Sequence, residues 1–227
     1  MNLDFDVISR SLPFLWKGFL YTVQLTAIAS IGGLFFGTLL ALARLSPIKP
    51  LSLLAAGYVN LMRSIPLVLV LFWFFFLMPN VLQLITGGER PPLIGAERTA
   101  LITFIMFEAA YFCEIMRAGI QSIPRGQVNS AYALGLTYGQ AMRLVILPQA
   151  FRNMIPVLLT QTIILFQDTS LVYVISATDF TGAASKIAQR DGRLIEMYLF
   201  VAVVYFILCY TLSFGVKRLQ KKIAVIR

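Results

Sequence analysis

The hydrophobic positions of this chain fall into long runs that polar segments separate. The second run is too long for one simple span and contains Arg63 and Pro66. We expect it to start at the surface or tilted, to bend at Ser64-Ile65-Pro66, and to continue as an apolar helix through Phe76, with Pro79-Asn80 loosening its outer end. Because each run is near the ~20 residues that cross a bilayer, the pattern predicts five membrane-spanning helices: Phe19–Leu42, Leu51–Leu84, Thr99–Gly119, Met154–Ser176 and Met197–Val216.

The polar segment between the third and fourth runs is too regular for an ordinary loop. Gly135 lies where a left-handed residue would end a short helix, and a second helix should start at Tyr138. Leu147-Pro148 should mark the end of that second helix. The segment 127–148 thus predicts a helix–turn–helix at the membrane surface, presented to a soluble partner. Two spacings support it, the helical face of Val128, Ala131, Tyr132 and Gly135 and the capping box of Thr137 and Gln140.

The same segment resembles the cytoplasmic coupling loop of ABC importer permeases. That loop reads Glu-Ala-Ala, three residues, Gly, nine residues, Ile, one residue and Leu-Pro. Here Ala131 matches the second alanine, Gly135 the glycine and Leu147-Pro148 the closing pair. Asn129 stands where the family has Glu, which weakens one contact to the ATPase, and Ser130 replaces the first alanine. The resemblance implies that the residues that couple to the ATPase are Gln127, Asn129, Ala131, Gly135, Arg143 and Pro148.

Further motifs extend the resemblance over nearly the whole chain. Phe107-Glu-Ala-Ala-Tyr111 and Phe166-Gln-Asp-Thr-Ser-Leu-Val172 are most similar to the glutamate/aspartate permeases of the polar amino acid branch. The resemblance implies an all-α integral membrane protein with the type I permease fold of ABC importers. It also implies three partners: a dimer of ATP-binding subunits, a second permease that is homologous or identical, and a periplasmic amino-acid-binding protein. The sequence does not identify the amino acid transported.

Composition agrees with a membrane protein. The 227 residues are 59% hydrophobic, against roughly 45–50% apolar residues in a soluble domain, and the mean hydropathy is +0.81. The chain has no histidine and no phosphate loop of the form GxxxxGK[ST]. The sequence therefore indicates no catalytic residue, cofactor or metal site, and any ATP hydrolysis must occur on another chain. We interpret the net charge of +9 as topology determinants that also attract anionic membrane lipid, rather than as a nucleic-acid surface.

Basic residues predict the orientation of the spans. One set of the segments that flank the spans carries many cations and a single acidic residue, Glu114, whereas the other set carries balanced charge. The cation-rich set should therefore face the cytoplasm. Five spans then put the N-terminus outside and the C-terminus inside a bacterial inner membrane. We expect a periplasmic segment at 1–18, a transmembrane domain at 19–216 with cytoplasmic coupling helices at 125–150, and a cytoplasmic basic tail at 217–227. The cations are Arg44, Lys49, Arg63, Arg117, Arg125, Arg143, Arg152, Lys217, Arg218, Lys221, Lys222 and Arg227.

Two carboxylates inside the spans are candidate substrate-path residues. Glu108 lies about ten residues into the third run, near ~15 Å deep, where a carboxylate is costly and usually functional. It could take the ammonium group of an amino acid, or it could hydrogen-bond another helix. Asp168, beside Thr169 and Ser170, could line a polar cavity at a helix break or cap a short helix near Leu171. Gln161 could extend this polar stripe or join two helices.

Two packing features are also predicted. Glu114 and Arg117 have the i, i+3 spacing of an ion pair near the inner face. Gly32-Gly33 and Gly37 should mark a close helix contact in the first span.

The sequence predicts a permease subunit of an ATP-driven amino acid importer that performs no covalent chemistry itself. An alternative is a secondary transporter driven by an ion gradient, which Glu108 and Asp168 would also suit. Five spans without an internal repeat argue against that alternative. A membrane enzyme is the least favoured reading, because histidine, a serine elbow and a metal cluster are all missing from the sequence.

Overall fold

The computed structural model describes residues 4–223, and all regular structure in this range is helical. Residues 1–3 of the expected periplasmic segment and residues 224–227 of the basic tail, including Arg227, lie outside the described residues. In chain order the helices are α1 Asp6–Arg44, α2 Lys49–Ser64, α3 Leu67–Phe72, η1 Trp73–Leu77, α4 Met78–Thr86, α5 Ala96–Gln121, α6 Arg125–Ala133, α7 Tyr138–Ala141, η2 Met142–Ile146, α8 Leu147–Asp168, η3 Thr169–Ile175, α9 Phe180–Asp191 and α10 Leu194–Ile223.

Five stretches of the described residues are long and apolar enough to cross a membrane, as predicted. They are Asp6–Arg44, Leu67–Thr86, Ala96–Gln121, Tyr138–Ile175 and Leu194–Ile223. The first helix begins at Asp6 rather than at Phe19 and contains Pro13. It extends this far because Val7 and Leu15 pack against α9 and α10, in a cluster with Phe180 and Met197.

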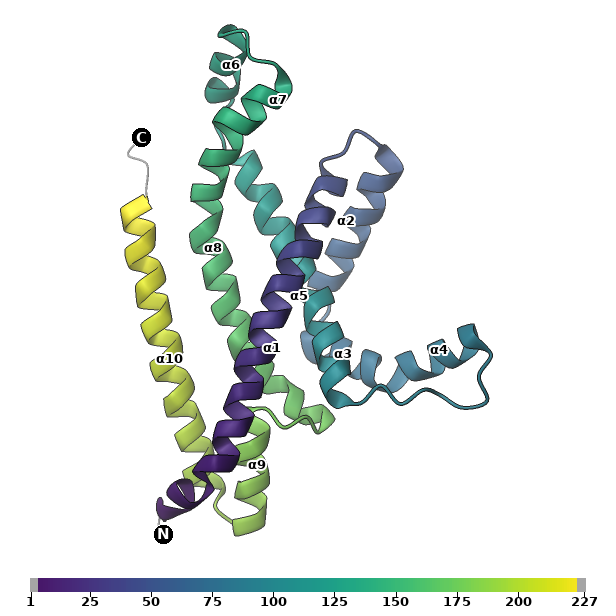
Figure 1. Ribbon diagram of the computed structural model, residues 1–227, viewed down its shortest axis with the longest axis vertical. Coiled ribbons are helices and arrows are strands. Elements are labelled where there is room, and N and C mark those ends of the chain that lie inside the picture. The colour runs from purple at the N-terminus through teal and green to yellow at the C-terminus, as the bar shows by residue number, and fades with distance from the viewer. Residues whose placement is uncertain (1–3, 224–227) are drawn as a thin grey trace.

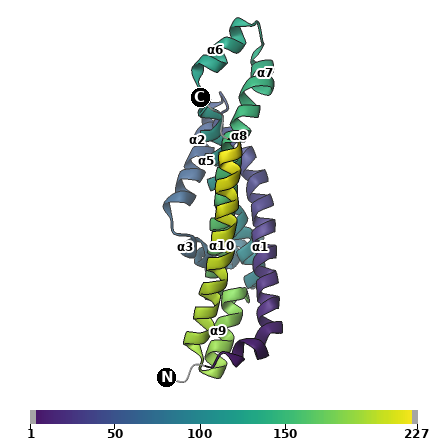
Figure 2. The ribbon, with the colours of Figure 1, turned by 90° about the vertical axis from the view of Figure 1, so that its left-hand side faces the viewer.

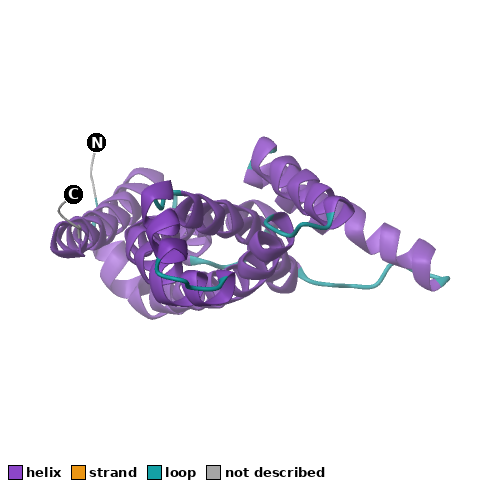
Figure 3. Cartoon of the chain, turned by 90° about the horizontal axis from the view of Figure 1, so that it is seen from above, coloured by secondary structure: helices purple, strands orange, loops and turns teal. Residues whose placement is uncertain are grey.

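The long helices run between two ends of the molecule (Figures 1 and 2). The helix pair α6–α7 forms one end, and α10 runs toward it. The first turns of α1 lie with α9 at the opposite end. Seen from above, α4 extends away from the remaining helices (Figure 3). The coupling segment and the first turns of α1 therefore occupy opposite ends of the bundle.

The tightest helix packing joins α1 to α5 at the predicted glycines. A Cβ atom built on Gly37 would lie 3.0 Å from both the Ala109 carbonyl oxygen and the Cys113 nitrogen. A Cβ atom on Gly33 would lie 2.8 Å from Cβ of Glu108. Because backbone atoms cannot move aside as side chains do, Gly37 is required for this approach. The expected close contact is confirmed, and it fixes where Glu108 sits.

The second apolar run bends where its sequence predicts. Ile65, at φ −114° and ψ 137°, is extended, and it separates α2 from α3 together with Pro66. A residue before proline avoids the helical region because the proline ring clashes with it. The preceding α2 is a regular helix whose Ala55 and Val59 are buried.

Pro148 does not end a helix as predicted, because α8 continues through it. Pro79 lies near the start of α4 in a similar way. Each proline follows a π turn, in which Leu147 N–H bonds Met142 O and Met78 N–H bonds Trp73 O. The wider turn changes the hydrogen-bonding pattern just where proline lacks a donor. The coupling segment therefore joins α8 without a break.

Helix α9 is absent from the sequence prediction. Asp179 caps its start by accepting hydrogen bonds from Gly182 N at 2.8 Å and Thr181 N at 3.0 Å. Gly192, with φ +67°, ends it in the left-handed conformation. With 12 residues, FTGAASKIAQRD, the helix is too short and too polar to show a spanning apolar run.

Burial raises the pKa of Asp179 from 3.8 to about 6, against the opposing effect of the Gly182 and Thr181 N–H groups. The folded chain then binds more protons than the unfolded chain between these values, so its stability should fall as pH rises from about 4 to about 6. Asp179→Asn keeps a capping oxygen and should remove this pH dependence, whereas Asp179→Ala should cost ~1 kcal/mol at pH 7. Unfolding of the purified protein across this pH range measures both effects. A wild-type stability that rises through the window would contradict the assignment.

Candidate functional site

Glu108 lies at the point where three helices meet. Its side chain is 1% exposed, and Gln161 Nε2 of α8 donates to its two carboxylate oxygens at 3.2 and 3.3 Å. Gly33 of α1 contacts its other side. Of the two roles considered for Glu108, the structure contains the interhelical hydrogen bond. This bond also confirms that Gln161 joins two helices.

Gln161 lines a groove between α2, α5 and α8, of about 410 Å³. Because Glu108 holds the amide of Gln161, it sets how that residue faces the groove. Glu108 itself is not part of the lining. The polar residues of the lining are Arg63, Tyr111, Glu114, Ser122, Asn153 and Gln161.

Asp168 ends α8 at its junction with η3. It is half-buried and its side chain accepts no capping hydrogen bond, so of the two roles considered for it, the cap of a short helix near Leu171 is not found. The capping role fails because η3 continues directly from the helical backbone of Asp168. Thr169 is fully buried and donates its hydroxyl to the Phe166 carbonyl at 2.7 Å, while Ser170 is half-buried.

Glu114 holds three helices together near the α6–α7 end of α5. The predicted pair with Arg117 is confirmed, and Arg44 of α1 forms a second ion pair with the same carboxylate. Arg63 of α2 reaches Oε2 of Glu114 at 3.8 Å and stacks over the Tyr111 ring, 5.5 Å from its centroid. From the sequence, Arg63 is expected only as a cation flanking a span. Its position at the end of an apolar stretch, three residues before Pro66, gives no sign that it would line a groove.

The segment 127–148 forms the predicted helix–turn–helix. Gly135 has φ +77°, and Leu136 N–H bonds the Ala131 carbonyl at 3.2 Å to close the first helix. Thr137 N–H donates to Gln140 Oε1 at 2.9 Å, and Gln140 N–H donates to Thr137 Oγ1 at 3.4 Å. The capping box that starts α7 is therefore present.

The exposed surface of this helix pair differs in part from the predicted coupling residues. Ala131 is buried, whereas the other five, Gln127, Asn129, Gly135, Arg143 and Pro148, are exposed. Three apolar residues outside the predicted coupling set are largely exposed here: Leu134 (82%), Tyr138 (67%) and Leu144 (62%). They are not part of the predicted helical face, which comprises Val128, Ala131, Tyr132 and Gly135. Exposed apolar residues at a polar helix pair indicate a surface that a partner covers.

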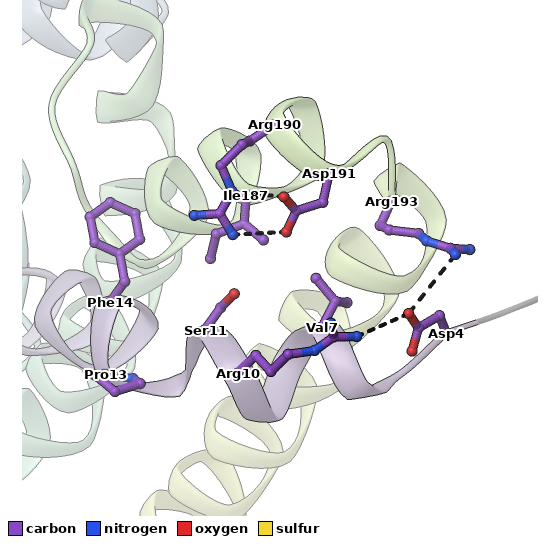
Figure 4. Close-up of a pocket in the computed structure, with 10 residues that line it drawn as sticks. All are labelled: Asp4, Val7, Arg10, Ser11, Pro13, Phe14, Ile187, Arg190, Asp191 and Arg193. Atoms are coloured by element: carbon purple, nitrogen blue, oxygen red, sulfur yellow. Dashed lines mark hydrogen bonds and ion pairs between the residues drawn. The ribbon is translucent and has the colours of Figure 1, made fainter.

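A second polar pocket, of about 610 Å³, lies at the opposite end of the molecule (Figure 4). Arg10 contacts Asp4 at 3.3 Å, and Arg190 contacts Asp191 at 2.7 Å. The Arg190 guanidinium holds the pKa of Asp191 below its ordinary value. The first turns of α1 and the end of α9 thus present paired charges at this end.

Comparisons with known proteins place the chain in a family. Residues 33–225 match the model of the binding-protein-dependent transport system inner membrane component. The chain is 50% identical to the glutamate/aspartate import permease protein GltK of Escherichia coli O157:H7, over 98% of this chain and 99% of that protein. It is 36% identical to the probable glutamine ABC transporter permease protein GlnP of Bacillus subtilis (strain 168), over 92% and 93% of the two chains.

A solved structure gives the same result. A chain in the crystal structure of an amino acid ABC transporter with histidines superposes with a TM-score of 0.88 at 31% identity, and the match covers 98% of this chain and 100% of that one. Sequence and fold agree over almost the entire length. The chain therefore belongs to the family of binding-protein-dependent inner membrane transport components, as an amino acid ABC transporter permease.

Proposed function

We propose that this permease imports glutamate and aspartate across the bacterial inner membrane, using ATP that a separate subunit hydrolyses. The observation that carries the proposal is the 50% identity, over nearly the whole of both chains, to a permease named for glutamate/aspartate import. The groove between α2, α5 and α8 supports it, because Arg63 supplies the positive charge that an acidic substrate needs. Glu108, Asp168, Gln161, Thr169 and Ser170 remain our candidates for the substrate path.

The helix pair α6–α7 is our candidate dock for a dimer of ATP-binding subunits. Its exposed residues Leu134, Tyr138 and Leu144 offer an apolar surface, and Gln127, Asn129 and Arg143 surround it with polar groups. An apolar centre with a polar rim is typical of protein interfaces. Closure of the ATPase dimer would move this pair, and the spans would alternate between outward and inward access.

The orientation follows from the same assignment. If α6–α7 faces the cytoplasm, the first turns of α1 and the pocket of Figure 4 face the periplasm. The charged groups around Arg10, Arg190 and Asp191 then lie where a periplasmic binding protein would deliver the amino acid. A second permease, identical or homologous, completes the translocation path.

Reconstitution tests this function directly. The complex of this chain with its ATPase, second permease and binding protein is placed in proteoliposomes, and uptake of radiolabelled glutamate and aspartate is measured with and without ATP. We expect uptake that requires ATP and loaded binding protein and persists with ionophores. Uptake that collapses with ionophores and ignores ATP would favour the secondary transporter. A preference for a basic amino acid would exclude the proposed substrate.

The substitution Asn129→Glu tests how the dock is built. Asn129 is exposed on α6, so a longer carboxylate meets no packing barrier there and adds one charge-assisted contact if a cation of the ATPase faces it. We expect assembly to be kept and ATPase coupling to be unchanged or raised slightly, less than about five-fold. Co-purification and stimulated ATPase activity measure this. Loss of the complex on Asn129→Glu would mean that this interface departs from the family pattern.

A further inference from the structure

We propose that Arg63 binds the side-chain carboxylate of the acidic amino acid as it passes through the groove between α2, α5 and α8. This inference rests on the proposed function, and it assigns the recognition of the substrate's extra negative charge to one residue. The assignment comes from the position of Arg63, the state of its donors and the groups that share its groove.

Arg63 is held in place without using its hydrogen-bond donors. Its guanidinium stacks over the Tyr111 ring and stands 3.8 Å from Glu114, too far for a hydrogen bond. Within residues 4–223 we find no hydrogen bond that Arg63 donates. A guanidinium has five N–H donors in a fork that matches a carboxylate. Stacking on Tyr111 thus orients the guanidinium, and its N–H donors remain available to a ligand in the groove.

The other arginines around Glu114 are arranged differently. Arg44 and Arg117 both form hydrogen bonds to the Glu114 carboxylate, and neither lines the groove. Their side chains are 15% and 27% exposed, whereas that of Arg63 is 39% exposed. Two arginines therefore neutralise Glu114, and the third retains a positive charge for a ligand.

The other end of the substrate has a matching partner in the same groove. Gln161 donates from its Nε2 to Glu108, which leaves the amide oxygen of Gln161 as an acceptor for an ammonium group. On α5, Tyr111 contacts Arg63 and Glu108 contacts Gln161. These two positions of α5 are three residues apart, about 4.5 Å along the helix. An amino acid that spans these two points would place its amino end at Gln161 and its acidic side chain at Arg63.

Direct binding to the complete transporter tests the assignment. The complex without binding protein is purified in nanodiscs, and its binding of radiolabelled glutamate and glutamine is compared for wild type, Arg63→Gln and Arg63→Lys. Arg44→Gln is the matched control, because it removes another arginine from Glu114, and Arg44 itself does not line the groove. We expect Arg63→Gln to weaken glutamate binding about ten-fold or more while glutamine binding stays unchanged. Arg63→Lys should retain part of the preference, because lysine keeps the charge without the fork.

The outcomes separate this inference from the proposed function. Should the wild-type complex bind no glutamate, or should Arg63→Gln keep its preference for glutamate over glutamine, the role of Arg63 is disproved. Equal losses in Arg63→Gln and Arg44→Gln would assign both arginines to structure and would also overturn it. If Arg63→Gln does not assemble, an unchanged preference in Arg63→Lys counts against the inference. Failure of the proposed function appears elsewhere, as absence of ATP-driven glutamate uptake by wild-type proteoliposomes.

Discussion

The substitution Gly135→Val is expected to lower ATP-driven uptake by about ten-fold or more, while the protein still inserts into the membrane. Gly135 has φ +77°, and a β-branched residue strains at such angles by ~1–2 kcal/mol or more. No atom lies within 4 Å of a Cβ built there, so the effect comes from the backbone and not from a clash. The turn between α6 and α7 would open, and the proposed dock would lose its shape.

Gly139→Val is the matched control for this prediction. Gly139 is exposed, has open space around its Cβ position, and lies in α7 without a positive φ. The substitution Gly139→Val therefore adds the same side chain to the same surface without strain at a positive φ. Uptake and ATPase association are measured for both variants. Normal values for Gly135→Val, or equal losses in both variants, would disprove a specific role of the turn.

The substitution Glu108→Gln is expected to reduce uptake about ten-fold while assembly and basal ATPase activity remain. The amide can still meet Gln161, so the three helices stay joined, but the charged acceptor is lost. A hydrogen bond to a charged group contributes ~1.5–3 kcal/mol, and its loss would free Gln161 to turn away from the groove. Uptake and complex yield are measured on the same preparations.

Two further variants test the hydrogen-bond partner of Glu108 and the second carboxylate within the spans. Gln161→Ala leaves a buried carboxylate without its donor, so it should lower complex yield as well as uptake. Asp168→Asn removes the second carboxylate without changing its size, and uptake should again fall with assembly intact. If both Glu108→Gln and Asp168→Asn transport glutamate and aspartate normally, these carboxylates serve only structure and our path assignment fails.

The sequence predicts those parts of the fold in which local chemistry decides the structure. Apolar length identifies the five spans, Ile65-Pro66 the bend, and Gly135 with Thr137 and Gln140 the helix–turn–helix. Each of these signals acts within a few residues or depends on the bilayer alone. The resemblance of the segment 127–148 to the coupling loop of ABC importer permeases then links this local structure to a function.

The remaining features depend on contacts between distant residues. Helix α9 is polar and rich in small residues, and it forms a buried element because α1 and α10 cover it. Its caps at Asp179 and Gly192 were the local signals that could have revealed it. The groove could not be predicted, because Arg63 and Tyr111 are separated by an entire span and meet only when α2 folds back along α5.

The π turn at Met142–Ile146 determines the direction in which the residues of the dock face. Each residue of an α-helix turns the chain by about 100°, and a π turn corresponds to one residue added to a regular helix. The turn therefore sets the azimuth of α7 relative to α8. Shortening this turn by a single residue would point Tyr138 about a quarter of a revolution away, with every residue of the dock otherwise unchanged.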